Sequence, residues 1–356
     1  MTAQSLFPRG IRLLLIAASL VIIIAGINQA QSVLVSLLVA AFLAMLATPP
    51  LLWLKRKRIP SVVAVLLVMA GMIAILLVAG AIVGASISSF YTHLPAYQVR
   101  MHEQASAFQA FLATKGINGM DQVLLEFANP KAVMSWTAQM LAGFGSALSN
   151  IVLILLTVAF ILFEAASFPA KLRAVLGNPR QRFPKFTLFI SAIERYMAIK
   201  TLVSLATGLL VGIWLAVLGV DFPILWGFIA FLLNYVPSVG STIAAVPAVL
   251  LAFIQFGMGH AAIAAAGYMT INFVLDNVIE TRLMGRKLSL STLVVFLSLI
   301  LWGSLLGPVG MVLCIPLTMT LKFACESNPD TQWIAVLLGP EVPVDTKPTK
   351  PADPDR

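Results

Sequence analysis

Apolar runs long enough to cross a lipid bilayer recur along this chain, as at 11–27, 33–54 and 61–86. A membrane-spanning helix needs about 20 such residues. Only 10% of the chain is charged, whereas soluble domains carry roughly 25% charged residues, so the missing polar surface must face lipid. Lipid-exposed backbone is hydrogen bonded within a helix or a closed barrel, and these runs exceed the roughly 10-residue segments of a barrel. The sequence therefore predicts an all-α, polytopic integral membrane protein.

The positive charge of the chain is concentrated in short clusters at the ends of apolar runs. The net charge is +9, and the densest cluster occupies 55–58. Cytoplasmic loops of membrane proteins carry such an excess of Lys and Arg. We therefore expect both termini in the cytoplasm and exclude a nucleic-acid partner.

The apolar runs divide the chain into about eight membrane segments. We expect N-terminal membrane helices within 1–87, an extracytoplasmic amphipathic helical subdomain over 88–143, a C-terminal membrane transport region over 144–325, and a cytoplasmic, partly disordered tail over 326–356. Individual helices are expected over 11–27, 33–54, 61–86, 147–168, 198–218 and 261–278. A separate helix ending at Met197 should lie in the membrane interface, because its apolar residues share one face.

The segment 88–143 mixes polar and apolar residues and contains four candidate helix breaks: Pro95, Gly116, Gly119 and Pro130. Apolar residues such as Leu94, Tyr97 and Met101 recur there at helical spacing. The subdomain rests on the membrane surface, packs against a neighbouring subunit, or forms a solvated helical hairpin.

Two apolar runs in the last third, 222–256 and 290–322, are interrupted by proline and glycine. The residues of the two breaks are Pro237, Gly240 and Pro247 in the first run, and Gly307, Pro308, Gly310 and Pro316 in the second. Each run is either a re-entrant hairpin, as the basic loop after residue 281 favours, or one long kinked crossing. A break frees backbone polar groups, which must then line a cavity or pack within protein. Matched broken segments indicate a transport site, although proline and glycine also merely kink membrane helices.

Several polar residues interrupt the apolar segments of the C-terminal region. The candidate substrate or ion path consists of Asn234, Tyr235, Asn272, Asp276, Asn277 and Glu280. Asn272, Asp276 and Glu280 are spaced four apart and share one helix face. That face either borders a polar cavity or lies at the interface, where Arg282 or Arg286 would pair with its carboxylates. For Glu164 and Lys200, near helix ends, we expect an interfacial ion pair or snorkelling.

The sequence indicates no catalytic centre. The histidines His93, His102 and His260 have no metal-ligand partner at helical spacing, and no Walker motif occurs. We therefore expect neither an enzyme nor a bound metal or cofactor.

At these motifs the sequence resembles the autoinducer-2 exporter family. The resemblance rests on 233–241 (LNYVPSVGS), 280–286 (ETRLMGR), 290–299 (LSTLVVFLSL) and 306–311 (LGPVGM). Thr281 stands where the family usually has proline. The resemblance implies a bacterial inner-membrane protein, a homo-oligomer (a pentamer is suspected), and export, or control of export, of the quorum-sensing signal autoinducer-2. Some relatives are described as sodium(lithium)/proton antiporters.

Three functional hypotheses follow. The first is a transporter of autoinducer-2 or a similar small polar solute, with Asn234, Asn272 and Asp276 as contacts between the two broken segments. The second is a cation/proton antiporter in which Asp276, with Glu280, titrates. The third is a non-transporting membrane scaffold built around 88–143. The expected partners are the lipid bilayer, the solute and, for the antiporter, protons or sodium.

Overall fold

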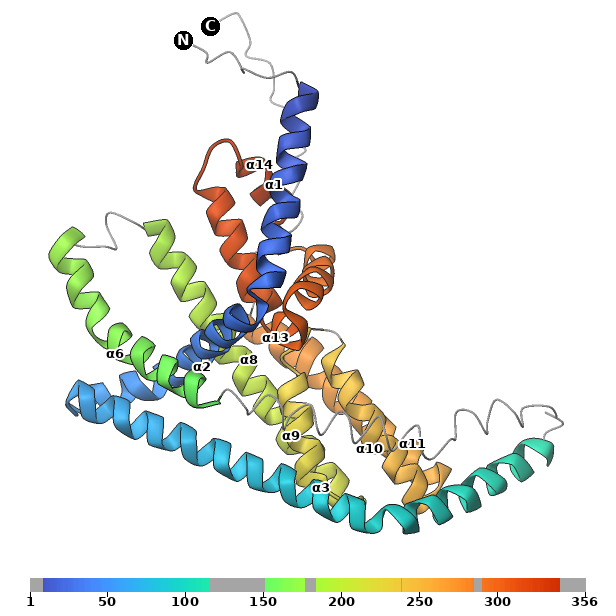
Figure 1. The fold of residues 1–356 in the computed structure, drawn as a ribbon. Helices are drawn as coiled ribbons and strands as arrows, with labels where there is room; N and C mark the ends of the chain where they lie inside the picture. The colour runs from blue at the N-terminus through green and yellow to red at the C-terminus, as the bar shows by residue number, and fades with distance from the viewer. Residues whose placement is uncertain (1–8, 115–150, 177–183, 238, 285–289, 340–356) are drawn as a thin grey trace, which may run out of the picture.

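The computed structural model describes residues 9–114, 151–176, 184–237, 239–284 and 290–339, and the secondary structure within these ranges is entirely helical (Figure 1). The N-terminal half contains α1 (Arg9–Gln29), α2 (Gln31–Arg56), α3 (Ser61–Thr114) and α6 (Ile151–Leu176). The C-terminal half contains α8 (Pro184–Val217), α9 (Pro223–Leu233), α10 (Gly240–Phe256), α11 (Met258–Asn272), η2 (Phe273–Glu280), α12 (Thr281–Met284), α13 (Thr292–Glu326) and α14 (Gln332–Leu337).

Five of the described helices are long and apolar enough to cross a membrane. They occupy Gln31–Arg56, Ser61–Met101, Phe186–Val217, Met258–Met284 and Thr292–Glu326. Three shorter apolar helices, Ile151–Ala165, Pro223–Leu233 and Gly240–Phe256, accompany them. Many large apolar side chains on these helices are exposed, as expected for a surface that faces lipid rather than water.

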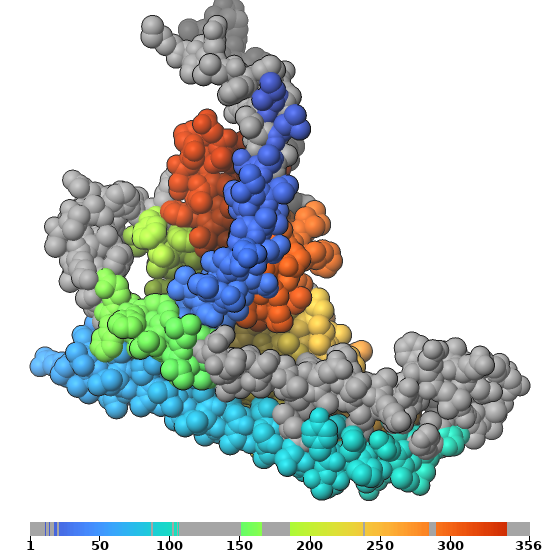
Figure 2. Space-filling model, viewed as in Figure 1, coloured from blue at the N-terminus to red at the C-terminus, as the bar shows by residue number. Residues whose placement is uncertain are grey.

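Helix α3 is far longer than the sequence indicated. We expected a helix ending at residue 86 and a break at Pro95, but one bent helix continues through Pro95 to Thr114 (Figure 1). Tyr97 and Met101 are buried just beyond the proline, and this packing stabilises a helix that a lone proline would otherwise interrupt. Residues 115–143 of the expected subdomain, with its other three breaks, lie outside the described residues. In Figure 2 the described part of α3 forms a long ridge along one edge of the molecule.

Helix α8 likewise joins two expected elements into one. The interfacial helix ending at Met197 and the membrane helix over 198–218 are a single helix from Pro184 to Val217. Tyr196 and Met197 are buried in a cluster that includes Cys314 and Met319 of α13. The C-terminal part of the face assigned to the membrane interface, Ile193, Tyr196 and Met197, therefore packs inside the protein, whereas Phe186 and Ile190 are exposed.

The first broken run folds back on itself as a helical hairpin. Helix α9, with only 11 residues, is about 16 Å long and too short to cross a bilayer core of about 30 Å. A tight turn follows, in which the amide of Val236 donates to the carbonyl of Leu233 (2.9 Å) and the amide of Gly240 to that of Val236 (3.3 Å). A Cβ on Gly240 would lie 1.7 Å from the carbonyl oxygen of Leu233, so this turn requires glycine.

The second broken run also folds back, within α13. Gly307 has non-helical angles (φ 65°, ψ −150°), which favour glycine. The indole Nε1 of Trp302 donates to Oγ1 of Thr318 at 3.0 Å, whereas sixteen positions of straight helix would span about 24 Å. A Cβ on Gly310 would lie 1.9 Å from the carbonyl oxygen of Trp302. Both runs thus fold back on themselves. Each turn contains a glycine in close contact with the backbone of the first arm.

A buried polar cluster ties the base of the first hairpin to α3. The Tyr97 hydroxyl donates to Oδ2 of Asp221 (2.6 Å), and the Gln255 amide donates to the same oxygen. The indole of Trp226 donates to the Asp221 carbonyl (3.0 Å). Side chains from α3, α9 and α10 therefore meet at Asp221, in the loop between α8 and α9.

Helices α8 and α9 pack backbone against backbone. A Cβ on Gly208 would lie 2.6 Å from the carbonyl oxygen of Gly227, and a Cβ on Gly227 the same distance from that of Gly208. Only glycine at both positions permits this approach. The turn that follows α9 is thereby held close to the α8 residues that precede Gly208.

Candidate functional site

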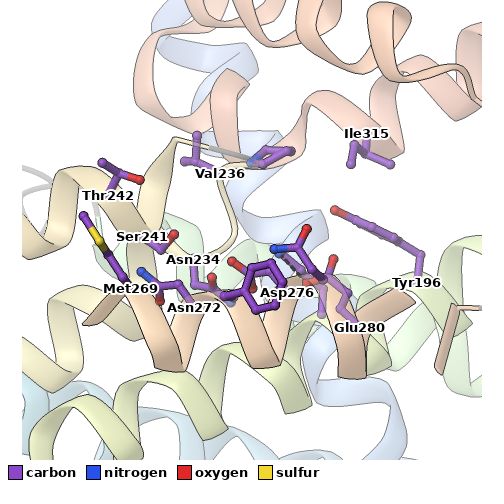
Figure 3. Close-up of a pocket in the computed structure, with 14 residues that line it drawn as sticks. Tyr196, Asn234, Val236, Ser241, Thr242, Met269, Asn272, Asp276, Glu280 and Ile315 are labelled. Atoms are coloured by element: carbon purple, nitrogen blue, oxygen red, sulfur yellow. Dashed lines mark hydrogen bonds and ion pairs between the residues drawn. The ribbon is translucent and has the colours of Figure 1, made fainter. Parts of the chain in front are cut away.

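A cavity of about 500 Å³ lies beside the turn of the first hairpin (Figure 3). Its walls come from α8, the α9–α10 turn, the start of α10, α11, η2 and one arm of α13. Besides Met269 and Phe273, the lining residues are Tyr196, Lys200, Asn234, Val236, Pro237, Ser241, Thr242, Asn272, Asp276, Asn277, Glu280 and Ile315. The size suits a small solute, and amides, hydroxyls and charged groups dominate the lining.

In the hairpin turn, Asn234 lines the cavity but its neighbour Tyr235 does not. Asn234 is 2% exposed and its Nδ2 donates to Oγ of Ser204 at 3.1 Å, which fixes the amide. The Tyr235 hydroxyl instead donates to Oγ1 of Thr201 (2.9 Å), while its ring packs edge-on against Phe42. Tyr235 holds the turn against α8 and is not among the lining residues.

The stripe predicted from the sequence spacing lines one wall of the cavity. Asn272, Asp276 and Glu280 all line it, and the last two belong to a π-helical stretch, η2. The wider turn of a π-helix, which is found frequently at functional sites, keeps residues four apart on nearly the same face. The stripe therefore borders a polar cavity, and Glu280 pairs with Lys200; Arg286, one of the two expected alternative partners, lies outside the described residues.

Lys200 lines the cavity, although the sequence analysis did not include it in the candidate path. We expected an interfacial ion pair or snorkelling; Lys200 does form an ion pair, with its Nζ 2.9 Å from Oε2 of Glu280, and its side chain is 6% exposed. Charges within an apolar bundle are stable only when paired and hydrogen bonded. The 80-residue separation along the chain hid this pair from any reading of local spacing.

Two cavity oxygens have no hydrogen-bond partner among the residues that the structure describes. Among the described residues, four buried side-chain polar atoms lack a hydrogen bond, and two of these are Oδ1 of Asn272 and Oδ1 of Asp276. Unpartnered buried acceptors are costly, and such groups are found where a ligand or water binds. Both are oxygens, so the complementary group is a hydrogen-bond donor or a cation.

The second break does not contribute to the cavity. Gly307, Pro308, Gly310 and Pro316 are not among its lining residues. The nearest atom to a Cβ on Gly307 would be Nε2 of Gln31, at the start of α2. The second hairpin reaches the cavity through Ile315, in its second arm. Of the two breaks expected to flank the site, only the first therefore borders this cavity.

Pro237 lines the cavity, whereas Gly240 and Pro247 are buried in α10 and shape the hairpin. Ser241 and Thr242 also line it, and sequence reasoning did not select them. They open α10, immediately after the turn, which is the signal that would have identified them.

Comparison with known proteins identifies relatives over nearly the whole chain. A profile of the AI-2E family transporters matches residues 15–329. The AI-2 transport protein TqsA of Escherichia coli K12 is 37% identical over 92% of this chain and 96% of its own length. YhhT of the same strain, named provisionally as a transport protein, is 35% identical over 94% of this chain and 96% of its own. A similarly named Haemophilus influenzae protein is 34% identical over 92% and 96%.

These relatives are named as transport proteins and not as enzymes. Together with the apolar helices, the match describes a multi-pass membrane transport protein. This chain belongs to the AI-2E transporter family.

Proposed function

We propose that this chain exports a small polar solute, autoinducer-2 or a similar molecule, through the cavity beside the first hairpin turn. The observation on which this rests is the pair of unpartnered oxygens on Asn272 and Asp276 within a cavity of about 500 Å³. A hydroxyl-rich solute donates hydrogen bonds to such acceptors. The name of the relative TqsA, an AI-2 transport protein, supports this substrate class.

The two hairpins support a specific membrane arrangement. If each is re-entrant, the first hairpin enters and leaves the membrane on the extracytoplasmic side, and the second on the cytoplasmic side. The basic residues 55–58 and the loop after Met284 are then both cytoplasmic. The N- and C-termini are then cytoplasmic in the inner membrane of a bacterium. The short first hairpin carries its turn into the bilayer, where the cavity gives a polar solute backbone and side-chain partners.

The test is efflux of autoinducer-2 from proteoliposomes that contain the purified protein. We expect efflux above empty vesicles, and Asn272→Leu should reduce it severalfold by removing an acceptor. Thr270→Val is the matched control, because Thr270 lies on the same helix, is exposed, and bonds only its own helix through the carbonyl of Ala266 (2.8 Å). Efflux equal to that of empty vesicles, or equal losses in both variants, would refute the proposal.

A second candidate, cation/proton antiport, is favoured by Asp276. Its Oδ1 is buried without a partner among the described residues, and a carboxylate at membrane depth is a candidate for binding protons or cations. In vesicles, a sodium gradient should then drive a pH change that Asp276→Asn abolishes. Normal exchange in that variant would exclude this candidate while leaving solute export untouched.

A further inference from the structure

The cavity contains an unequal number of positive and negative groups. Its charged lining residues are Lys200, Asp276 and Glu280. Lys200 and Glu280 form an ion pair at 2.9 Å, and the Asp276 carboxylate has one buried oxygen with no partner in the described part of the chain. With all three ionised, the cavity holds one net negative charge.

Lys200 provides the positive charge that offsets the two carboxylates of the cavity. It projects from α8, whereas both carboxylates lie on η2, one helical turn apart. The lysine side chain is 6% exposed, so water and salt screen its charge less than at an exposed position. Without Lys200 the same cavity would present two carboxylates and the Asn272 oxygen, a set of hard oxygen ligands suited to a divalent cation.

We infer that Lys200 is the selectivity residue of the cavity: by neutralising Glu280 it leaves one negative charge, which admits uncharged or singly cationic polar solutes and excludes anions and divalent cations. This inference rests on the proposed transport function and specifies the solute class. Lys200 acts by setting the charge of the site, so its effect depends on Glu280 being present.

Three substitutions separate charge from shape, because glutamine preserves polarity and approximate size. Lys200→Gln gives the cavity two net negative charges, and Glu280→Gln gives it none. The double variant Lys200→Gln/Glu280→Gln returns it to one negative charge, as in the wild type, although the ion pair is gone. If the ion pair matters only for folding, the double variant should remain altered. If Lys200 sets selectivity through its charge, the double variant should behave as the wild type does.

The experiment measures Mn²⁺ binding to the purified protein in detergent. Binding is detected as the loss of the electron paramagnetic resonance signal of the free ion. Lys200→Gln should bind Mn²⁺ about tenfold or more tightly than wild type, because a second uncompensated carboxylate faces the ion. The double variant should return to wild-type binding. Lys322→Gln is the matched control, since Lys322 is a second buried lysine whose Nζ lies 3.6 Å from Glu326, outside the cavity.

Unchanged Mn²⁺ binding in Lys200→Gln, or equally tight binding in the double variant, would overturn the inference. If Lys200→Gln melts too readily to titrate, Glu280→Gln decides instead, because its cavity has no net charge: methylammonium uptake into vesicles, relative to that of an uncharged polar solute, should fall below wild type, and an unchanged ratio would overturn the inference. The Mn²⁺ titration itself does not depend on transport. A protein that fails to export autoinducer-2 but gains Mn²⁺ binding as expected would therefore refute the export proposal alone.

Discussion

The turn of the first hairpin should not tolerate a single added methyl group at Gly240. A Cβ there would lie 1.7 Å from the carbonyl oxygen of Leu233, whereas ordinary contact begins at 3.4 Å. One of the two atoms must therefore move by about 1.7 Å. Both belong to a turn anchored at its two ends, so no flexible side chain can absorb the shift.

Overpacking a well-packed site costs typically ~1–3 kcal/mol. Because the opposing atom is backbone, we expect Gly240→Ala to fall at the upper end, near 3 kcal/mol, which lowers the folded-to-unfolded ratio about a hundredfold. The shift also displaces Asn234 from the cavity. Autoinducer-2 efflux should consequently fall even under conditions in which the variant remains folded.

The assay is reversible unfolding in mixed micelles titrated with sodium dodecyl sulfate, followed by far-ultraviolet circular dichroism. Gly80→Ala in α3 is the control, since a Cβ there meets nothing within 4 Å. It should leave stability unchanged or raise it by up to about 1 kcal/mol through helix propensity. Equal stability and equal efflux for the two variants would refute the reasoning.

Two further substitutions test the remaining contacts. Tyr97→Phe removes a hydrogen bond to the Asp221 carboxylate and should cost about 1.5–3 kcal/mol in the same titration, whereas Tyr91→Phe, on an exposed ring of the same helix, should cost nothing measurable. Trp302→Phe should cost about 0.5–1.5 kcal/mol. In a double-mutant cycle this loss should vanish when Thr318 is already valine, and simple additivity would contradict the folded-back arrangement of α13.

Local pattern was enough to predict an all-helical chain and the face that lines the cavity. The four-residue spacing of Asn272, Asp276 and Glu280 placed three polar groups together, and the π-helical turn preserved that alignment. Proline and glycine at 237–240 and 307–310 indicated where both runs turn. Only glycine lets the backbone approach as closely as Gly240 and Gly310 do.

Long-range contacts were beyond the reach of sequence reasoning. The pairing of Lys200 with Glu280 depends on how α8 crosses η2, which spacing does not encode. Continuation of α3 through Pro95 depends on burial of Tyr97 and Met101 against other helices, and tertiary packing overrode the local signal. The second turn matched the first as a motif, yet its position beside Gln31 follows from chain topology.

The glycine contact between α8 and α9 limits how the cavity can open. Gly208 and Gly227 have no side chains, so the backbones of α8 and α9 are in direct contact there. Because this contact fixes α9 against α8, Lys200 and the hairpin turn form one rigid wall of the cavity. The ion pair between Lys200 and Glu280 also ties η2 to this wall.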